Sequence, residues 1–388
     1  MKKIVFKNNI LERTINTKYI ILLLPIFVII GKVVRWTIMV DTLINQSKGW
    51  GYVNVIIGDV DIPFVLFSAE DALAGEYGGT NNMYLLYRVF WNLCLRIPND
   101  FYSFEIALTL LFTFILFLLF CKLKPNLLVS EFIFISLAVI VLSVYCFSLA
   151  KEPMQMIYFL LLFLVIYTDK IPDNKKLIAA IAVILFSAAT FRVYYVIFLI
   201  FGGVFFLVIK LFKKEKLTNW NIVLIFLFMV VTYFVMLSIL YVALPSLYHR
   251  LADSLLYASV ATSSSNTYME NIITQSKTNV LIVALEYGLA SLRMLFPFEL
   301  VTLGVKYWPY IIYQLCMTFM FIKSLKTFNT NSKIQNIALI VFVGFVFGSA
   351  TFEVDFGAWI RHGAVTLPVM LLMLGNIKEK ILPSEVEK

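Results

Sequence analysis

The chain has 388 residues, of which 61% are hydrophobic and 14% are charged, and its mean hydropathy is +0.90. Soluble globular proteins carry about 45–50% apolar and about 25% charged residues, so this composition excludes a soluble domain with one anchor. It indicates a polytopic membrane protein, whose net charge of +9 is an orientation signal and does not indicate a nucleic-acid partner.

Residues 1–18 form a polar, basic lead that the positive-inside rule places in the cytoplasm. After this lead, the chain alternates between apolar runs and short basic segments. A bilayer core about 30 Å thick needs about 20 apolar residues per helix. We therefore expect one integral membrane domain, residues 1–388, folded as an all-α helical bundle. About ten transmembrane helices are expected, at residues 19–40, 103–120, 127–149, 154–167, 177–190, 192–212, 220–244, 307–322, 334–350 and 363–374.

Two long polar segments, residues 42–102 and 245–306, are expected to be outer loops. Each contains a mixed apolar and charged stretch, at 83–97 and 280–298, that predicts an interfacial helix. Residues 375–388 form a second cytoplasmic tail. With both termini inside, most lysines and arginines fall on the inner side, and the rest of the chain is slightly acidic.

The segment Lys151-Glu152-Pro153 separates two strongly apolar runs. Proline suits the first turn of a new helix, because its missing N–H would have no intrahelical partner there. The pattern predicts a hairpin whose tip, with its two opposite charges, reaches the outer face. A solvated turn with its own ion pair is the alternative.

Two arginines are expected near the same face. Arg192 opens an apolar run and is followed by Tyr194 and Tyr195, and Arg361 follows Trp359. Charged groups near membrane depth are costly and usually face a protein interior or a cavity. Arg192 could instead snorkel to the lipid headgroups, and Arg361 could instead form a structural ion pair with Glu353 or Asp355.

Other polar residues add weaker candidates. His362 follows Arg361 and could act as an acid or a base near neutral pH. Asp59 and Asp61 lie in the first outer loop, and Arg293 lies in the second. No histidine- or cysteine-rich metal pattern, phosphate-binding loop or dinucleotide fingerprint is found in the sequence, so we expect no metal and no cofactor.

The layout of two long outer loops, with the Lys151-Glu152 step, Phe191-Arg192 and Arg361…Pro368, resembles bacterial polysaccharide polymerases of the Wzy type and related exopolysaccharide polymerases. These belong to the wider group of C-type membrane glycosyltransferases. The resemblance covers most of the chain by layout but only a few residues by motif. It implies polymerisation of undecaprenyl-diphosphate-linked repeat units on the outer face of the bacterial cytoplasmic membrane.

Under this resemblance, Glu152, Arg192, Arg361 and His362 are expected to be catalytic. The arginines would stabilise the departing diphosphate, and Glu152 would take the acceptor proton. The expected partners are lipid-linked oligosaccharide and membrane lipid, with a chain-length regulator and a flippase as candidate protein partners. The expected substrate-binding residues are Lys151, Arg293, Tyr194, Tyr195, Trp359, Asp59 and Asp61.

Three alternatives remain open at this point. A C-type glycosyltransferase with a lipid-monophosphate donor would depend on Asp41, Asp59 or Asp61 and on a divalent metal. A flippase or other transporter would show internal repeats and broken helices at mid-membrane. The third alternative is a membrane scaffold without catalytic activity.

Overall fold

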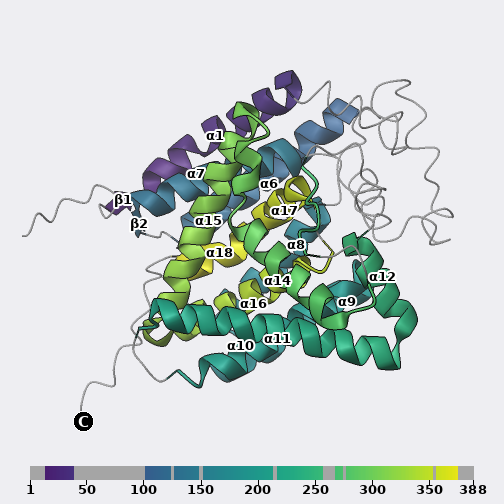
Figure 1. Cartoon of the computed structure of the whole chain (residues 1–388). Coiled ribbons are helices and arrows are strands. Elements are labelled where there is room, and N and C mark those ends of the chain that lie inside the picture. Colours follow the sequence, from purple (N-terminus) through teal and green to yellow (C-terminus); the bar gives the residue numbers. More distant parts are fainter. Residues whose placement is uncertain are drawn as a thin grey trace, which may run out of the picture.

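The computed structural model describes residues 14–38, 101–123, 126–147, 152–212, 216–256, 267–273, 277–352 and 355–374. Regular structure in these residues is almost entirely helical, which confirms the all-α prediction (Figure 1). The helices are α1 (Thr17–Ile38), α6 (Phe101–Leu123), α7 (Val129–Tyr145), α8 (Glu152–Tyr167), α9 (Asp173–Thr190), α10 (Val196–Ile209), α11 (Asn219–Ala243), α12 (Pro245–Leu256), α14 (Val280–Leu295), α15 (Trp308–Lys326), α16 (Lys333–Ser349), α17 (Phe356–Ala364) and α18 (Leu367–Leu374).

Several helices begin at a polar residue whose side chain caps the first turn. Asp355 Oδ1 accepts a hydrogen bond of 2.8 Å from the backbone N–H of Ala358 at the start of α17. Thr218, Asn279 and Ser332 accept equivalent bonds at the starts of α11, α14 and α16. Because such caps satisfy N–H groups that lack an intrahelical partner, these four starts are fixed locally by the sequence.

A short antiparallel ribbon ties the beginning of the chain to the connection between α6 and α7. Its strands are β1 (Thr14–Asn16) and β2 (Asn126–Leu128), with Ile15 opposite Leu127. The ribbon places the start of α1, the end of α6 and the start of α7 at one end of the bundle (Figure 1). The end of α1, the start of α6 and the end of α7 therefore meet at the opposite end.

Small residues allow close helix packing at two places. A Cβ atom on Gly31 of α1 would lie 2.5 Å from Cβ of Ser143 on α7. A Cβ atom on Gly344 of α16 would lie 2.3 Å from the backbone oxygen of Phe198 on α10. Such contacts bring backbones together in the way that is common between membrane helices.

Three described segments are long and apolar enough to cross a membrane, namely Thr17–Thr37, Glu105–Leu123 and Asn219–Ala243. The pair α17 and α18 adds a fourth if it is taken as one broken span. By length and composition, the described residues therefore supply three or four spans and not the ten that the sequence predicted. Helix length is one reason, and a second is polarity, because α9 and α15 have 18 and 19 residues but are not apolar enough. Helices α7, α8 and α16 contain 17, 16 and 17 residues, and at about 1.5 Å per residue they fall short of a bilayer core about 30 Å thick.

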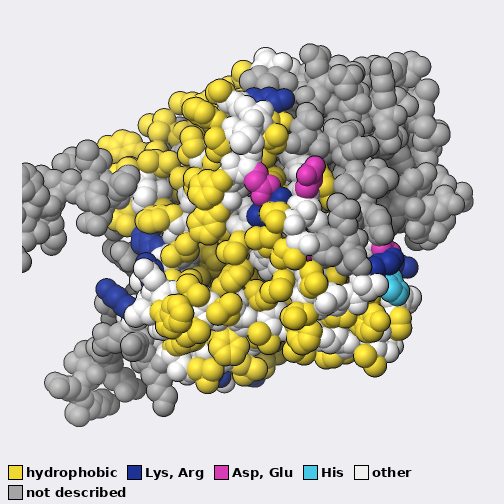
Figure 2. All heavy atoms as spheres, viewed as in Figure 1, with side chains coloured by type: hydrophobic (Ala, Val, Ile, Leu, Met, Phe, Trp, Pro, Cys, Tyr) yellow, Lys and Arg dark blue, Asp and Glu magenta, His cyan; other side chains and the backbone are white. Residues whose placement is uncertain are grey.

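The surface of the described part supports a membrane location. Hydrophobic side chains cover most of the face shown in Figure 2, and charged side chains there are few. Leu110 and Phe114 on α6, and Leu227 on α11, are 66%, 57% and 50% exposed. Large apolar surfaces of this kind are unfavourable in water and favourable in lipid.

A bend of 64° separates α17 from α18, where the sequence predicted one span at 363–374. Thr366 supplies the hydrogen bonds at the break. Its backbone N–H and its hydroxyl both donate to the backbone oxygen of Gly363, at 3.1 and 2.7 Å. Both helices are mostly buried in the bundle. As a result, Arg361 and His362 lie in the last turn of α17, directly before a break in the helix.

Part of the segment predicted as the second outer loop packs against the bundle and includes helix α14. A helix was predicted at 280–298, and α14 covers residues 280–295 of it and is largely buried; its interfacial position stays a prediction. The carboxylate of Glu286 on α14 accepts hydrogen bonds from the backbone N–H groups of Ile272 and Ile273, at 2.9 and 2.7 Å. Thr267 also donates to Asp355 at the start of α17, at 2.9 Å. Residues 267–273 thus connect α14 with α17. The helix expected at 83–97 lies outside the described residues.

Candidate functional site

Glu152, Arg361 and His362 come from distant parts of the chain and lie together inside the bundle. Glu152 Oε1 is 3.7 Å from Arg361 Nε and 3.7 Å from His362 Nε2. Glu152 and His362 are each only 1% exposed, whereas the Arg361 side chain is 36% exposed. The three residues form a carboxylate–guanidinium–imidazole cluster that is buried on one side and reaches the surface through the arginine.

Helix ends favour these charges where they lie. Glu152 occupies the first turn of α8, and Arg361 and His362 occupy the last turn of α17. A helix N-terminus carries a partial positive charge and a C-terminus a partial negative charge, so both helices stabilise the charges that they present. The separations of 3.7 Å are ion-pair distances and are longer than hydrogen bonds. The carboxylate oxygen Oε1 thus lies within ion-pair distance of the guanidinium and of the imidazole, and neither of these two contacts is a hydrogen bond.

Aromatic and polar residues surround the cluster. The Arg361 guanidinium lies 6.0 Å from the centre of the Tyr145 ring. The fully buried Trp359 stacks on Phe345, with ring centres 5.5 Å apart. Within the described residues, Trp359 Nε1 and Gln155 Oε1 are buried and have no hydrogen-bond partner. Gln155 lies one turn after Glu152 on α8, so a donor and an acceptor remain available beside the cluster.

Arg192 lies in extended backbone between α9 and a 3-10 turn, Val193–Tyr195. Its guanidinium bonds to the Tyr194 hydroxyl and lies over the rings of Phe191 and Tyr194, at 5.1 and 5.3 Å from their centres. Tyr194 in turn stacks on Phe352, with ring centres 4.1 Å apart. Because Phe352 immediately precedes the connection to α17, these contacts link Arg192 to the segment that leads to Arg361.

The other predicted substrate-binding residues are placed differently. Tyr195 is buried and stacks on Phe198, with ring centres 4.6 Å apart. Arg293 on α14 is paired through two nitrogens with the Glu299 carboxylate, and its Nη1 donates to the backbone oxygen of Glu270 at 2.6 Å. These contacts join α14 to Glu299 and to residues 267–273. Lys151, Asp59 and Asp61 lie outside the described residues.

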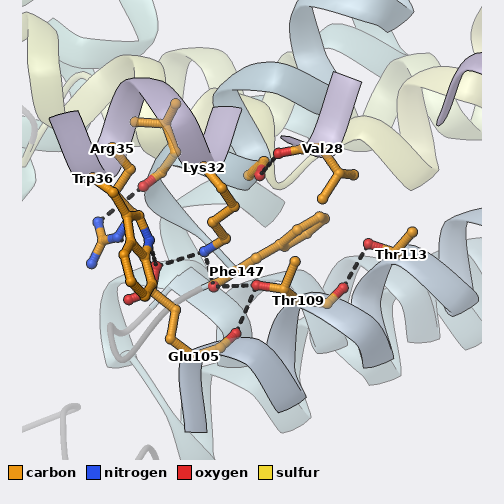
Figure 3. A network of polar contacts seen from close by, with 10 residues as sticks. Val28, Lys32, Arg35, Trp36, Glu105, Thr109, Thr113 and Phe147 are labelled. Atoms are coloured by element: carbon orange, nitrogen blue, oxygen red, sulfur yellow. Dashed lines mark hydrogen bonds and ion pairs between the residues drawn. The ribbon is translucent and has the colours of Figure 1, made fainter. Parts of the chain in front are cut away.

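A second charged cluster was not predicted from the sequence (Figure 3). On α1, Lys32 Nζ and Arg35 Nε contact Oε1 of Glu105 on α6 at 2.6 and 2.7 Å. Trp36 Nε1 donates to the same oxygen at 3.3 Å. Lys32 and Arg35 are charges that interrupt an apolar run three residues apart, so they share a helix face. That spacing was the signal that could have identified them.

The end of α7 lies between the two clusters. Arg35 Nη1 donates to the backbone oxygen of Val144 at 2.9 Å, and Lys32 Nζ donates to that of Phe147 at 2.6 Å. The intervening Cys146 thiol lies 3.9 Å from the backbone oxygen of Arg361. The two clusters thus lie at one end of the bundle, on the two sides of the C-terminal end of α7. Their titratable residues are Lys32, Arg35, Glu105, Glu152, Arg361 and His362.

Within the described residues, no group of three or more His, Cys, Asp or Glu side chains is arranged to hold a metal ion. The cluster chemistry of this part of the chain is that of carboxylates, guanidinium groups, an imidazole and aromatic rings.

Comparisons of the chain with protein-family models, with curated proteins and with solved structures give no match.

Proposed function

We propose that the chain polymerises oligosaccharide repeat units linked to undecaprenyl diphosphate at the outer face of a bacterial cytoplasmic membrane. The observation that carries the proposal is the cluster of Glu152, Arg361 and His362, which is buried at helix ends of an apolar bundle. Buried charges of both signs are costly and are retained mainly where they perform chemistry or fix a structure.

The proposed reaction assigns one task to each group. A sugar hydroxyl of the incoming unit attacks the anomeric carbon of the growing chain, and the bond from that carbon to the diphosphate breaks. Glu152, with His362 as the alternative, takes the hydroxyl proton. Arg361 stabilises the negative charge that develops on the departing lipid diphosphate, because its forked donors match phosphate oxygens. Arg192 and Lys151 are proposed to assist from neighbouring positions.

The proposal includes the ten-span layout. Helices α7, α8, α10 and α16 are apolar and are shorter than a full span. In a bundle, they can be embedded with their ends in protein or in a locally thinned bilayer. The outer face is then the end that carries Glu152 and Arg192, and the inner end is rich in lysine.

The direct test is to purify the full chain into lipid vesicles and to supply undecaprenyl-diphosphate-linked oligosaccharide without nucleotide or ATP. We expect longer lipid-linked oligosaccharides and the release of one free undecaprenyl diphosphate for each new glycosidic bond. A preparation that binds the substrate but neither lengthens it nor releases the diphosphate would argue against polymerisation.

The break between α17 and α18 favours a second candidate, a transporter of lipid-linked oligosaccharide. Broken helices at membrane depth are typical of transporter binding sites. The same vesicles distinguish the two functions. Transport moves the intact substrate to the other leaflet without changing its length, whereas polymerisation changes the length. The glycosyltransferase with a monophosphate donor depends on Asp41, Asp59 or Asp61, which lie outside the described residues.

A further inference from the structure

The cluster of Lys32, Arg35, Trp36 and Glu105, here termed the α1–α6 cluster, has an uneven pattern of hydrogen bonds. All three donors converge on one carboxylate oxygen, Glu105 Oε1. The other oxygen, Oε2, is buried and has no hydrogen-bond partner within the described residues. Since a buried acceptor without a donor is costly, this oxygen requires an explanation.

Arg35 shows the complementary feature. Its Nε bonds to Glu105 and its Nη1 to Val144, but the described residues provide no acceptor for its Nη2. The guanidinium therefore does not form a bidentate pair of hydrogen bonds with the carboxylate. The edge of Arg35, the Glu105 carboxylate and the Trp36 indole lie next to one another in Figure 3. An available donor edge and an available acceptor are thus adjacent.

Charge and exposure define what would fit this place. Two cations share one carboxylate, so the α1–α6 cluster carries a net charge of about +1 at neutral pH. Trp36 is 38% exposed, whereas Arg35 is 6% exposed. The cluster thus opens to its surroundings at an indole ring, which is an apolar platform with one polar edge. A complementary ligand has an anionic oxygen, a hydroxyl group and a ring with one apolar face.

We propose that the α1–α6 cluster binds a glycosyl phosphate, the junction between a sugar ring and a phosphate group. A phosphate oxygen accepts from Arg35 Nη2, a sugar hydroxyl donates to Glu105 Oε2, and the ring lies against Trp36. This inference rests on the proposed function, because it makes the cluster the part of the substrate site that recognises the sugar attached to the lipid diphosphate.

The test measures ligand binding and does not depend on turnover. The purified full chain in lipid nanodiscs is titrated with inorganic phosphate and, separately, with the 1-phosphates of glucose, galactose and N-acetylglucosamine. We expect at least one sugar phosphate to bind about tenfold more tightly than inorganic phosphate, because one further hydrogen bond to a charged group forms. If none binds more tightly than inorganic phosphate, the inference is wrong.

Two substitutions should have opposite effects on inorganic phosphate. Arg35→Gln should weaken both classes of ligand about tenfold or more. Glu105→Gln removes a competing negative charge, so it should strengthen binding of inorganic phosphate while abolishing the preference for the sugar phosphate. A purely structural cluster predicts no such opposition. Arg35→Lys, which keeps the charge and removes the fork, should bind phosphate with intermediate affinity and guards against misfolding of the glutamine variant.

The pair Lys323 and Glu131, 2.9 Å apart, joins α15 to α7 and provides a matched control. Lys323→Gln should leave both affinities unchanged.

Measurements of polymerisation and of ligand binding distinguish the proposed function from the proposed role of the cluster. Loss of polymerisation without any change in sugar-phosphate binding in Arg35→Gln refutes the cluster assignment alone, whereas sugar-phosphate binding by a chain that never lengthens its substrate refutes only the proposed function. A separate titration with undecaprenyl phosphate, which has no sugar, detects a site for a lipid headgroup. If undecaprenyl phosphate binds as tightly as the sugar 1-phosphates or more tightly, sugar recognition is refuted.

Discussion

Two buried carboxylates at one end of the bundle are held in different ways. Glu105 Oε1 accepts bonds of 2.6 and 2.7 Å from Lys32 and Arg35. Glu152 Oε1 lies 3.7 Å from both Arg361 and His362. A general base must offer an oxygen that can approach the proton that it takes, and Glu105 Oε1 already accepts from three donors, so Glu152 is the better candidate. The tightly bonded Glu105 suits positioning.

The arginine beside Glu152 should be needed for charge stabilisation. In Arg361→Ala, we expect polymer formation to fall by about a hundredfold or more, because a preorganised electrostatic partner of the leaving group is lost. Arg361→Lys should recover only part of the rate, since a single ammonium replaces the forked donors. Chain length and initial rate are measured on the purified variants.

The control for this series is Lys323→Gln at the other end of the bundle, with expression and insertion compared by detergent extraction. Normal chain lengths in Arg361→Ala would count decisively against the catalytic role.

At the scale of elements, the close contact between α10 and α16 can be tested by substituting a glycine. Gly344→Ala places a Cβ atom 2.3 Å from the Phe198 backbone oxygen. We expect a loss of stability of about 1–3 kcal/mol, because one of the two helices must shift. The midpoint of thermal unfolding in detergent measures the change.

Gly203 on α10 is the matched control, because a Cβ atom there meets nothing within 4 Å. Gly203→Ala should leave the unfolding midpoint unchanged or raise it, since alanine favours a helix over glycine by up to about 1 kcal/mol. Equal losses in the two variants would show that steric contact is not the cause.

Residues 267–273 form a second element-scale test. Glu286→Ala removes the carboxylate that accepts from the N–H groups of Ile272 and Ile273. We expect faster hydrogen exchange at these two amides and faster proteolysis of the segment, because local opening no longer breaks two charge-assisted bonds. Exchange at residues within α14 should change less. Unaltered protection at 272 and 273 would refute the role of Glu286.

For the whole molecule, orientation is the property to test. Helix α9 has 18 residues and rises about 27 Å, so the proposed ten-span layout puts residues 170 and 193 near opposite faces of the membrane. In a cysteine-free background, Val193→Cys should react with a membrane-impermeant maleimide in intact cells, as Val193 is 79% exposed. Lys170→Cys should react only after permeabilisation. The reverse pattern would invert the proposed topology.

Some features could be predicted from the sequence because they depend on local patterns. Composition alone was sufficient for the all-α class. The sequence predicted Glu152 at the tip of a hairpin before the helix that Pro153 begins, whereas the structure has Glu152 1% exposed in the first turn of α8. The convergence of Glu152 with Arg361 and His362 was expected from the alternation of spans. The roles of these residues remain predictions.

Other features depend on tertiary packing and could not be predicted. The break after α17 depends on Thr366, whose hydroxyl satisfies a backbone oxygen that a straight helix would bond internally. The pairing of Glu105 with Lys32 and Arg35 joins residues separated by a long loop, and no periodicity indicates it. Arg293 was assigned to substrate on charge alone, but whether an arginine faces a ligand or a neighbouring carboxylate is decided by the folded chain.

The β1–β2 ribbon has a consequence for biosynthesis. The two strands are separated by more than a hundred residues, which a ribosome adds at about 5–20 residues per second. The first helix therefore waits on the order of ten seconds before its lasting neighbours are made. During that time, Lys32 and Arg35 have neither Glu105 nor the α7 carbonyls beside them. We therefore expect the insertion machinery, or a chaperone in the bilayer, to shield these two charges until Glu105 and α7 are made.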